Sequence, residues 1–200
     1  MKTLLVIKSS LFNGSGQSSK LVDRFAASWQ QKNRGARVVV RDLAADPVAH
    51  LSAEAFQGFA LPVEQRSPAQ HAAAAISDSL IAELKQADAV AIGLPMYNFT
   101  VPSTFKAWMD HVARVGVSFE YTENGPRGLL ESKPVYVFAA RGGQYQGTEA
   151  DTQTGLVRTF LGFIGLADVE FVYAEGLGMG EEAAQRALAE AGERIERLAA

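Results

Sequence analysis

The apolar residues of this chain gather in five short runs that are separated by longer amphipathic stretches. Each run is rich in β-branched or aromatic residues, and most are continuous rather than alternating, which is typical of strands buried on both faces. The runs lie at residues 3–7, 37–40, 87–92, 134–139 and 169–173. They predict five strands of a sheet that carries helices on both sides.

The stretches between the runs have the spacing of amphipathic helices. The first places Leu21, Phe25 and Trp29 on one face. The pair Ser67-Pro68 combines a favoured N-cap with proline at the first helical position, so it predicts a helix start. Helices are expected at residues 18–33, 67–86, 102–113, 152–165 and 181–199.

Alternation of strand and helix along the chain predicts right-handed crossovers and a parallel sheet. Five strands favour a flavodoxin-like α/β fold, a doubly wound parallel sheet of order 2-1-3-4-5. Because no linker or repeat interrupts the pattern, residues 1–200 are expected to form one domain. Residues 44–66 are expected to be loop-rich. Residues 117–130 alternate and then turn at Asn124-Gly125, which predicts a hairpin-like flap.

Composition excludes several classes of function. The formal net charge is −3 without a basic block, so nucleic-acid binding is not expected. The chain has no cysteine, so redox chemistry would require a bound cofactor. The first apolar run is shorter than the roughly 7–15 residues of a signal peptide or the 20 of a membrane span, which favours a cytoplasmic protein without membrane contact. The three histidines lack ligand spacing, so no metal site is expected and each is interpreted as structural.

Ligands of such a sheet bind at the carboxyl ends of the strands, where the strand order reverses. The loop at residues 9–19, SSLFNGSGQSS, is rich in hydroxyls and leads into a helix N-terminus, where phosphates bind. It could equally be a capping loop with Ser18 or Ser19 as N-cap. Gly14 and Gly16 give G-x-G, but serine occupies the third glycine position of a dinucleotide fingerprint. The loop therefore favours a monophosphate.

Two further loops meet at this point. Pro95 ends a strand and Pro102 begins a helix, so residues 96–99 should form a rigid loop whose N–H groups and Asn98 amide can bind the polar edge of a planar ring. The ring would be flanked by Met96, Tyr97 and Phe99. Gly142-Gly143 allows the backbone to approach a flat ligand. The alternatives are aromatic packing beneath the next helix and a simple glycine turn.

These motifs resemble the FMN-dependent NADH-azoreductases, flavodoxin-like quinone reductases of bacteria. The resemblance runs nearly end to end and rests chiefly on P-M-Y-N-F at 95–99, Y-T-E-N-G-P at 121–126, R-G-G at 141–143 and T-F-L-G-F-I-G at 159–165. It implies a homodimer with one non-covalent FMN per subunit at the interface. It also implies NADH as the hydride donor and quinones and azo compounds as acceptors.

The resemblance also assigns residues. The FMN phosphate is expected at Ser10, Gly16, Gln17 and Ser18, and the ring at Met96, Tyr97, Asn98, Phe99, Ala140, Arg141, Gly142 and Gly143. The substrate pocket is expected at Asn98, Tyr121 and Phe163, without a conventional catalytic residue. The family commonly has serine where this chain has Gly16 and Ala140, so Gly16→Ser is expected to tighten FMN binding or leave it unchanged.

The expected reaction is a two-electron, ping-pong hydride transfer, because donor and acceptor would use the same flavin face. The alternative is a flavodoxin-like electron carrier without NADH-dependent turnover. Such carriers are usually strongly acidic, whereas this chain is only mildly so. The stretch Phe160–Leu166 is apolar nearly all round, and its exposed aromatic face at Phe160 and Phe163 is interpreted as a dimer contact.

Overall fold

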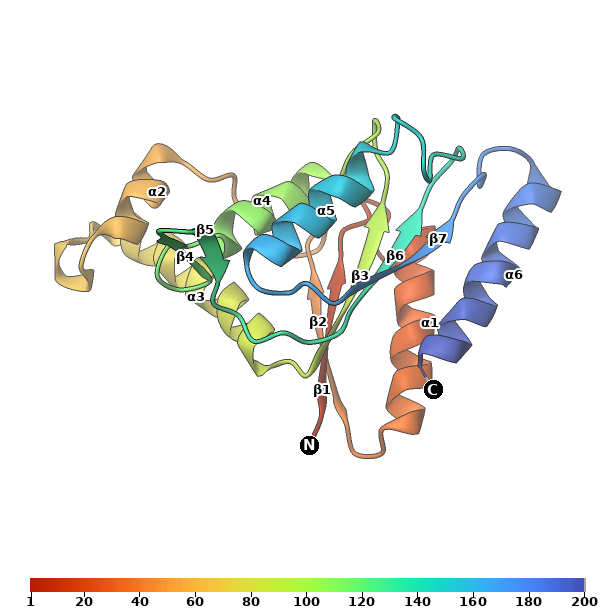
Figure 1. Ribbon diagram of the computed structural model, residues 1–200, viewed down its shortest axis with the longest axis horizontal. Coiled ribbons are helices and arrows are strands. Elements are labelled where there is room, and N and C mark those ends of the chain that lie inside the picture. Colours follow the sequence, from red (N-terminus) through yellow and green to blue (C-terminus); the bar gives the residue numbers. More distant parts are fainter. Residues whose placement is uncertain (200) are drawn as a thin grey trace.

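The five apolar runs form one parallel sheet in the computed structural model, which describes residues 1–199. The strands are β1 (Thr3–Lys8), β2 (Arg37–Asp42), β3 (Ala89–Pro95), β6 (Val135–Ala140) and β7 (Val169–Ala174). They lie in the order β2-β1-β3-β6-β7, and every neighbouring pair is parallel (Figure 1). This confirms the predicted flavodoxin-like order, with two flap strands taking the intervening numbers.

Helices cover both faces of the sheet. One face carries α1 (Gln17–Lys32) and α6 (Glu181–Leu198). The other carries α3 (Pro68–Gln86), α4 (Ser103–Val112) and α5 (Thr152–Phe163), as Figure 1 shows. The predicted start of α3 is confirmed, since Ser67 and Gln70 form a reciprocal capping box ahead of Pro68. No helix among residues 1–199 has the length and apolar character to cross a membrane.

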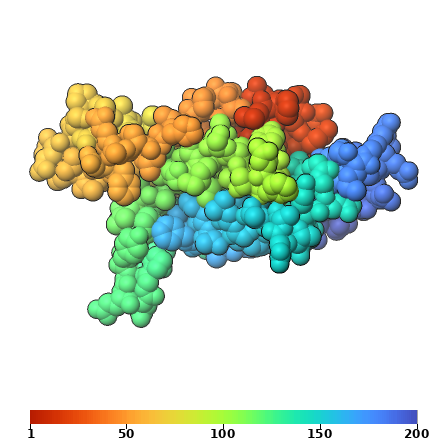
Figure 2. All heavy atoms as spheres, turned by 90° about the horizontal axis from the view of Figure 1, so that it is seen from above, coloured from red at the N-terminus to blue at the C-terminus, as the bar shows by residue number. Residues whose placement is uncertain are grey.

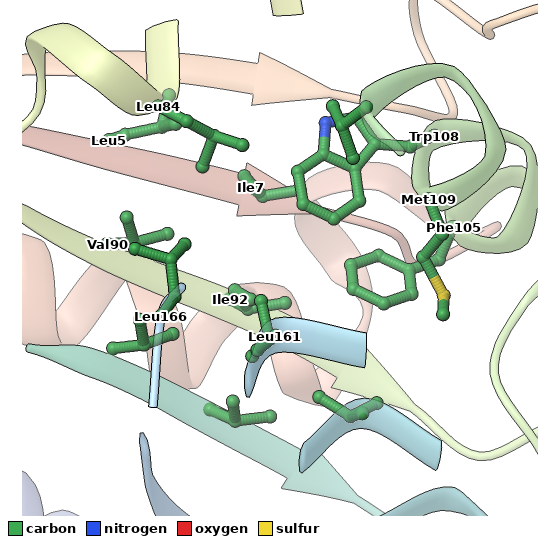
Figure 3. Close-up of a cluster of buried hydrophobic side chains, with 14 of the residues drawn as sticks. Leu5, Ile7, Leu84, Val90, Ile92, Phe105, Trp108, Met109, Leu161 and Leu166 are labelled. Carbon is green, nitrogen blue, oxygen red and sulfur yellow. The ribbon is translucent and has the colours of Figure 1, made fainter. Parts of the chain in front are cut away.

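The side chains of a strand point alternately to the two faces of the sheet, so they pack in two separate cores. Leu5 and Ile7 face α3, α4 and α5, whereas Leu4 and Val6 face α1 and α6. Figure 3 shows the first core, in which Trp108 lies over Ile7 and the side chains of β3 and α5 close the cluster. Burial of each such side chain contributes about 1.5–3 kcal/mol, so the two cores hold the strand ends, and the loops that follow them, in place.

The segment expected to be loop-rich contains a helix, which corrects that prediction. Helix α2 (Ala53–Ala60) begins at Ser52, whose hydroxyl accepts a hydrogen bond from the Ala55 N–H. It packs against α3 so closely that a side chain at Gly58 would lie 2.6 Å from the Gln70 Cβ. The helix has only eight residues, about two turns, which is too short a window for a helical period to be recognised in the sequence.

The predicted flap is an antiparallel hairpin of β4 (Phe119–Thr122) and β5 (Gly125–Gly128). Seen from above in Figure 2, it projects from the body of the molecule, as does the α2 region. Phe119 anchors its base against Phe163 of α5, with ring centroids 4.2 Å apart. The single chain therefore carries two arms beside a packed sheet.

Candidate functional site

A cavity of about 200 Å³ lies where the loops after β1, β3 and β6 meet. It is lined by Ser10, Phe12, Gly16, Gln17, Ser18, Pro95, Met96, Tyr97, Ala140, Arg141, Gly142 and Leu177. The three loops chosen from the sequence therefore come together. Asn98, Phe99 and Gly143, which were also predicted to bind the cofactor, do not line this cavity. Phe12, Pro95 and Leu177 line it without having been among the residues predicted to bind the cofactor.

One end of the cavity is the N-terminus of α1. The helix begins at Gln17 with Gly16 as its N-cap, and no side chain caps it, so the interpretation of Ser18 or Ser19 as N-cap is wrong. The Ser18 hydroxyl is buried and has no hydrogen-bond partner. Because buried polar groups are nearly always paired, an unpaired hydroxyl beside the free N–H groups of a first helical turn fits an anion such as a phosphate.

The Ser10 side chain leaves no room for a side chain at position 16. A Cβ at this position would lie 2.1 Å from the Ser10 Oγ and 2.8 Å from the Ser10 Cβ. Ser10 in turn accepts a hydrogen bond from the Phe12 N–H, which holds it in place. The structure therefore argues against the expectation that serine at position 16 is harmless, since the added side chain would displace Ser10 from the cavity.

The loop after β3 is a tight turn with unusual backbone conformations. Tyr97 and Thr100 exchange two backbone hydrogen bonds of 3.1 Å, while Asn98 and Phe99 have φ values of 50° and 68°. Positive φ at both central residues defines a type I′ turn, which normally favours asparagine and glycine. Strained backbone of this kind clusters at functional sites, and here the turn begins at Tyr97, which lines the cavity.

Tyr97 connects this turn to the loop after β1. Its hydroxyl accepts a hydrogen bond from the Leu11 N–H at 3.2 Å and lies 3.5 Å from the Ser10 Oγ. Phe99 is 53% exposed and meets Tyr145 edge-on. Packing beneath α4, the alternative for these two aromatic residues, is therefore not what the structure shows.

The glycine pair after β6 turns its carbonyls away from the cavity. The carbonyl oxygens of Gly142 and Gly143 accept hydrogen bonds from the N–H groups of Gly178 and Gly176, each at 2.9 Å. No atom lies within 4 Å of the position that a Gly142 side chain would take. Gly142 therefore leaves room for a flat ligand where it lines the cavity, whereas a side chain at Gly143 would lie 2.7 Å from the Tyr145 ring.

Arg141 lies at the cavity, but its side chain points away from it. The guanidinium is completely buried and forms ion pairs of 2.9 Å with Asp151 and Glu175. Burial alone would raise the pKa of Asp151, but hydrogen bonds from the Thr154 N–H and Arg141 outweigh it and hold that pKa below its usual value. Only the backbone of Arg141 can contact a ligand, so the predicted place of this residue beside the ring would depend on its main-chain atoms.

A second, larger cavity of about 790 Å³ adjoins the first and shares Met96 and Tyr97 with it. Its walls are Leu11, Asn98, Thr100, Val101, Pro102, Ser103, Lys106 and Leu156 in addition to these two residues. The lining is mostly apolar, as expected of a space that holds an aromatic molecule. Asn98 therefore lies at this cavity rather than at the first.

The three residues expected to form the substrate pocket do not meet within one chain. Asn98 follows β3 beside the start of α5, where the Thr152 hydroxyl donates to the Phe99 carbonyl. Phe163 lies at the far end of α5, roughly 17 Å along its axis. Tyr121 is 72% exposed on the flap. A pocket containing all three would need a second chain.

The aromatic face of α5 is also less exposed than its sequence suggests. Phe163 is half-buried against Phe119, and Phe160 meets Trp108 edge-on with 6.0 Å between ring centroids. The aromatic face is therefore only partly exposed, because the flap covers part of Phe163 and α4 covers part of Phe160. Leu161 and Ile164, in contrast, are fully buried in the core.

Comparison with known proteins agrees with this geometry. A family model for the flavodoxin-like fold matches residues 1–199. The FMN-dependent NADH:quinone oxidoreductase of Cellvibrio japonicus is 50% identical over 196 residues, covering 98% of each chain. The protein of that name from Alcanivorax borkumensis is 52% identical over 186 residues, 93% of this chain and 94% of its own.

This chain belongs to the FMN-dependent NADH:quinone oxidoreductase family. The crystal structure of azoreductase AzrA superposes on it with a TM-score of 0.90 at 27% identity, covering 98% of both chains. Membership of this family confirms the resemblance drawn from the P-M-Y-N-F and Y-T-E-N-G-P motifs. Among residues 1–199, no cluster of three or more potential metal ligands is present.

Phe12 and Leu177 were missed for different reasons. Phe12 stands in a loop selected for its hydroxyls, where an exposed aromatic residue carried no signal. Leu177 follows the fifth strand of the sheet, whose loop was not considered, and reaches the cavity because its N–H bonds the Arg141 carbonyl at 3.1 Å. The repeated glycines of E-G-L-G-M-G at 175–180 were the available signal for a loop that approaches its neighbour closely.

Proposed function

We propose that this protein is an FMN-dependent NADH:quinone oxidoreductase that also cleaves aromatic azo compounds reductively. The observation that carries the proposal is the buried, unpartnered Ser18 hydroxyl at the N-terminus of α1, in a cavity whose other walls are the β3 turn and the glycine pair. A monophosphate fits the N-terminus of α1, and a planar ring joined to it fits between the β3 turn and the glycine pair. Family membership supplies the specific choice of FMN and NADH.

FMN, when bound, supplies the redox chemistry by accepting a hydride and passing two electrons to an acceptor. The chain's contribution is binding, orientation and electrostatics. Ser18, Gln17 and the first-turn N–H groups of α1 would hold the phosphate without a cationic side chain. The backbone N–H of Gly142, which lines the cavity, would stabilise negative charge at a ring edge.

The rest of the active site would come from a second copy of the chain. The single chain separates Asn98 from Tyr121 and Phe163, so we propose a homodimer in which the flap of one subunit closes the large cavity of the other. The proposed acceptors are quinones and azo compounds, which are planar and fit a mostly apolar space. Use of NADH as the donor favours a cytoplasmic location.

Anaerobic spectroscopy and steady-state kinetics test this function. The purified protein is expected to bind FMN, and NADH should bleach the flavin absorption in a two-electron step. With a benzoquinone as acceptor, double-reciprocal plots at several NADH concentrations are expected to be parallel, as in a ping-pong reaction at one shared cavity. Intersecting lines would contradict the shared cavity.

The same experiment separates an enzyme from an electron carrier. A carrier would bind FMN but would not consume NADH unless a separate reductase were added. Decolourisation of an aromatic azo dye by NADH alone would establish the second activity. If the protein does not bind FMN at micromolar concentration, the proposed function is wrong.

A further inference from the structure

Arg141 is the centre of a buried polar network that the proposed reaction does not use directly. Besides its ion pairs with Asp151 and Glu175, its guanidinium bonds the Thr154 hydroxyl at 3.0 Å and the Gln153 side-chain oxygen at 3.3 Å. None of the guanidinium is exposed. A buried charge is retained only when its partners satisfy it, and here four side chains do so.

Gln153 extends this network to the turn after β3. Its Nε2 donates to the Pro95 carbonyl at 2.9 Å and to the Thr100 carbonyl at 3.3 Å. Both carbonyls are acceptors only, and the Arg141 Nε–H is a donor only, so the amide of Gln153 has one satisfied orientation. Gln153 itself is fully buried. It therefore joins both ends of the Tyr97–Thr100 turn to the residue that begins the loop after β6.

Glu175 extends the network in the opposite direction. Its Oε1 accepts from the Arg141 guanidinium and from the N–H groups of Tyr145 and Gln146, the latter two at 3.0 Å. The loop that contains the glycine pair is thus fixed from behind. A direct backbone bond from the Met96 N–H to the Ala140 carbonyl, 3.1 Å long, lies on the cavity side of the same junction.

We propose that Arg141 and Gln153 are positioning residues that set the separation of the two ring-binding loops. The inference rests on the proposed function, because it concerns how the chain prepares those loops for a flavin ring. Neither side chain offers the ring a donor, but both fix backbone that does. No bond of Arg141 or Gln153 reaches Ser10, Gly16 or Ser18, and the turn contacts the phosphate end only through the Tyr97 hydroxyl, so the network should control chiefly the ring.

The decisive variant is Gln153→Glu. It preserves size and the contact with Arg141, but it replaces the donor that faces Pro95 and Thr100 with a second acceptor. Binding of FMN and of riboflavin, measured by quenching of flavin fluorescence, is expected to weaken by a similar factor of roughly ten, since hydrogen bonds that hold the ring loops are lost. Ser18→Ala, in contrast, should weaken FMN binding only, because riboflavin has no phosphate.

Gln153→Leu is the second variant, since it removes the same donors without adding charge. Arg114→Lys is the matched control: Arg114 is also buried and ion-paired, to Asp78, but it contacts neither ring-binding loop. The control is expected to lower the melting temperature without changing affinity for riboflavin. Equal losses of riboflavin affinity in the control and in the Gln153 variants would reduce the network to a general stabilising role and overturn the proposal.

Hydrogen exchange of the ligand-free protein tests the linkage independently of any flavin. In both Gln153 variants the amides of Met96, Tyr97 and Thr100 are expected to exchange at least tenfold faster, while that of Lys20 in α1 stays protected. Unchanged exchange at the turn would overturn the proposal even if the wild type binds FMN and reduces quinones. Failure of the wild type to bind FMN would instead count against the proposed function, and the exchange result would still decide the linkage.

Discussion

Ser18 and Gly16 lie two residues apart at the start of α1 and constrain the phosphate end in opposite ways. Ser18 carries a hydroxyl that the folded chain leaves unpaired, which costs folding free energy. Gly16 lacks a side chain because the space belongs to Ser10. Ser18 thus offers an unpaired hydroxyl to a ligand, and the missing side chain of Gly16 leaves Ser10 in position.

Ser18→Ala is expected to weaken FMN binding by roughly tenfold or more, since a hydrogen bond to a charged group contributes about 1.5–3 kcal/mol. The same change should leave the melting temperature of the ligand-free protein equal or higher, because it removes an unpaired buried oxygen. Fluorescence titration and thermal unfolding measure the two effects. A less stable apoprotein with normal FMN affinity would mean that the hydroxyl is structural.

Gly16→Ser is expected to weaken FMN binding, although it restores the residue common in the family. The added Cβ would displace the Ser10 side chain, and with it the contacts to the Phe12 N–H and the Tyr97 hydroxyl. The double variant Gly16→Ser, Ser10→Gly removes the collision and should recover part of the affinity. Tighter FMN binding by the single variant would show that Ser10 rearranges without loss.

At the scale of elements, His111 of α4 contacts the segment that leads into α2. Its Nε2 lies 3.1 Å from the Ala49 carbonyl, which accepts only, so Nε2 carries the proton and the buried Nδ1 is left without a partner. Burial lowers the pKa of His111 below its ordinary 6.5, although the Ala49 carbonyl and Asp110 act in the opposite direction. The folded protein therefore favours the neutral ring.

The free energy of unfolding is expected to fall as the pH drops below about 6.5. Between the folded and the unfolded pKa of His111, the unfolded chain binds more protons, so acid favours unfolding. Urea denaturation between pH 5 and 8 measures this dependence. His111→Gln should flatten it, while His71→Gln, on the exposed face of α3, serves as the control and should not. An unchanged slope in the His111 variant would assign the pH dependence to other groups.

The sequence predicted those elements whose signal is local and repeated. All five sheet strands, their order, the Ser67 helix start and the flap were predictable, because buried parallel strands and alternating hairpins have distinct periods. Helix α2 was not, since eight residues are too short a window for a helical period to be recognised. Nor was the direction of the Arg141 side chain, which depends on Asp151 and Glu175 from other elements. The clash that a side chain at position 16 would make with Ser10 could not be predicted either, because it depends on where Ser10 lies in the folded chain.

At the scale of the whole molecule, the flap and the α2 region extend in different directions from the same end of the body (Figure 2). The flap carries Tyr121 at its exposed surface, far from the Asn98 turn of its own chain. A partner that covers this arm would bury apolar surface, such as that of Tyr121, which the single chain leaves exposed. The shape of the chain therefore supports a partner that receives the arm.

Light scattering is expected to give twice the chain mass of 21.5 kDa. Tyr121→Ala should change quinone kinetics severalfold with little effect on FMN affinity or on stability, because the side chain is mostly exposed within its own chain. Val40→Ala on the edge strand β2, also exposed, is the control and should change none of these. Phe163→Ala is less specific, since it also loosens the flap at Phe119. A fully active monomer at nanomolar concentration would contradict the arrangement.

The turn at Asn98 and Phe99 has a thermodynamic consequence for ligand binding. Two backbone bonds, the Gln153 amide and the Thr152 hydroxyl already confine this loop before any ligand arrives. A ring that docks there orders little additional chain, so its binding entropy is expected to lack the large unfavourable contribution of coupled folding. The strained left-handed backbone thus lowers the stability of the apoprotein, and in return the loop has almost no conformational freedom left to lose on binding.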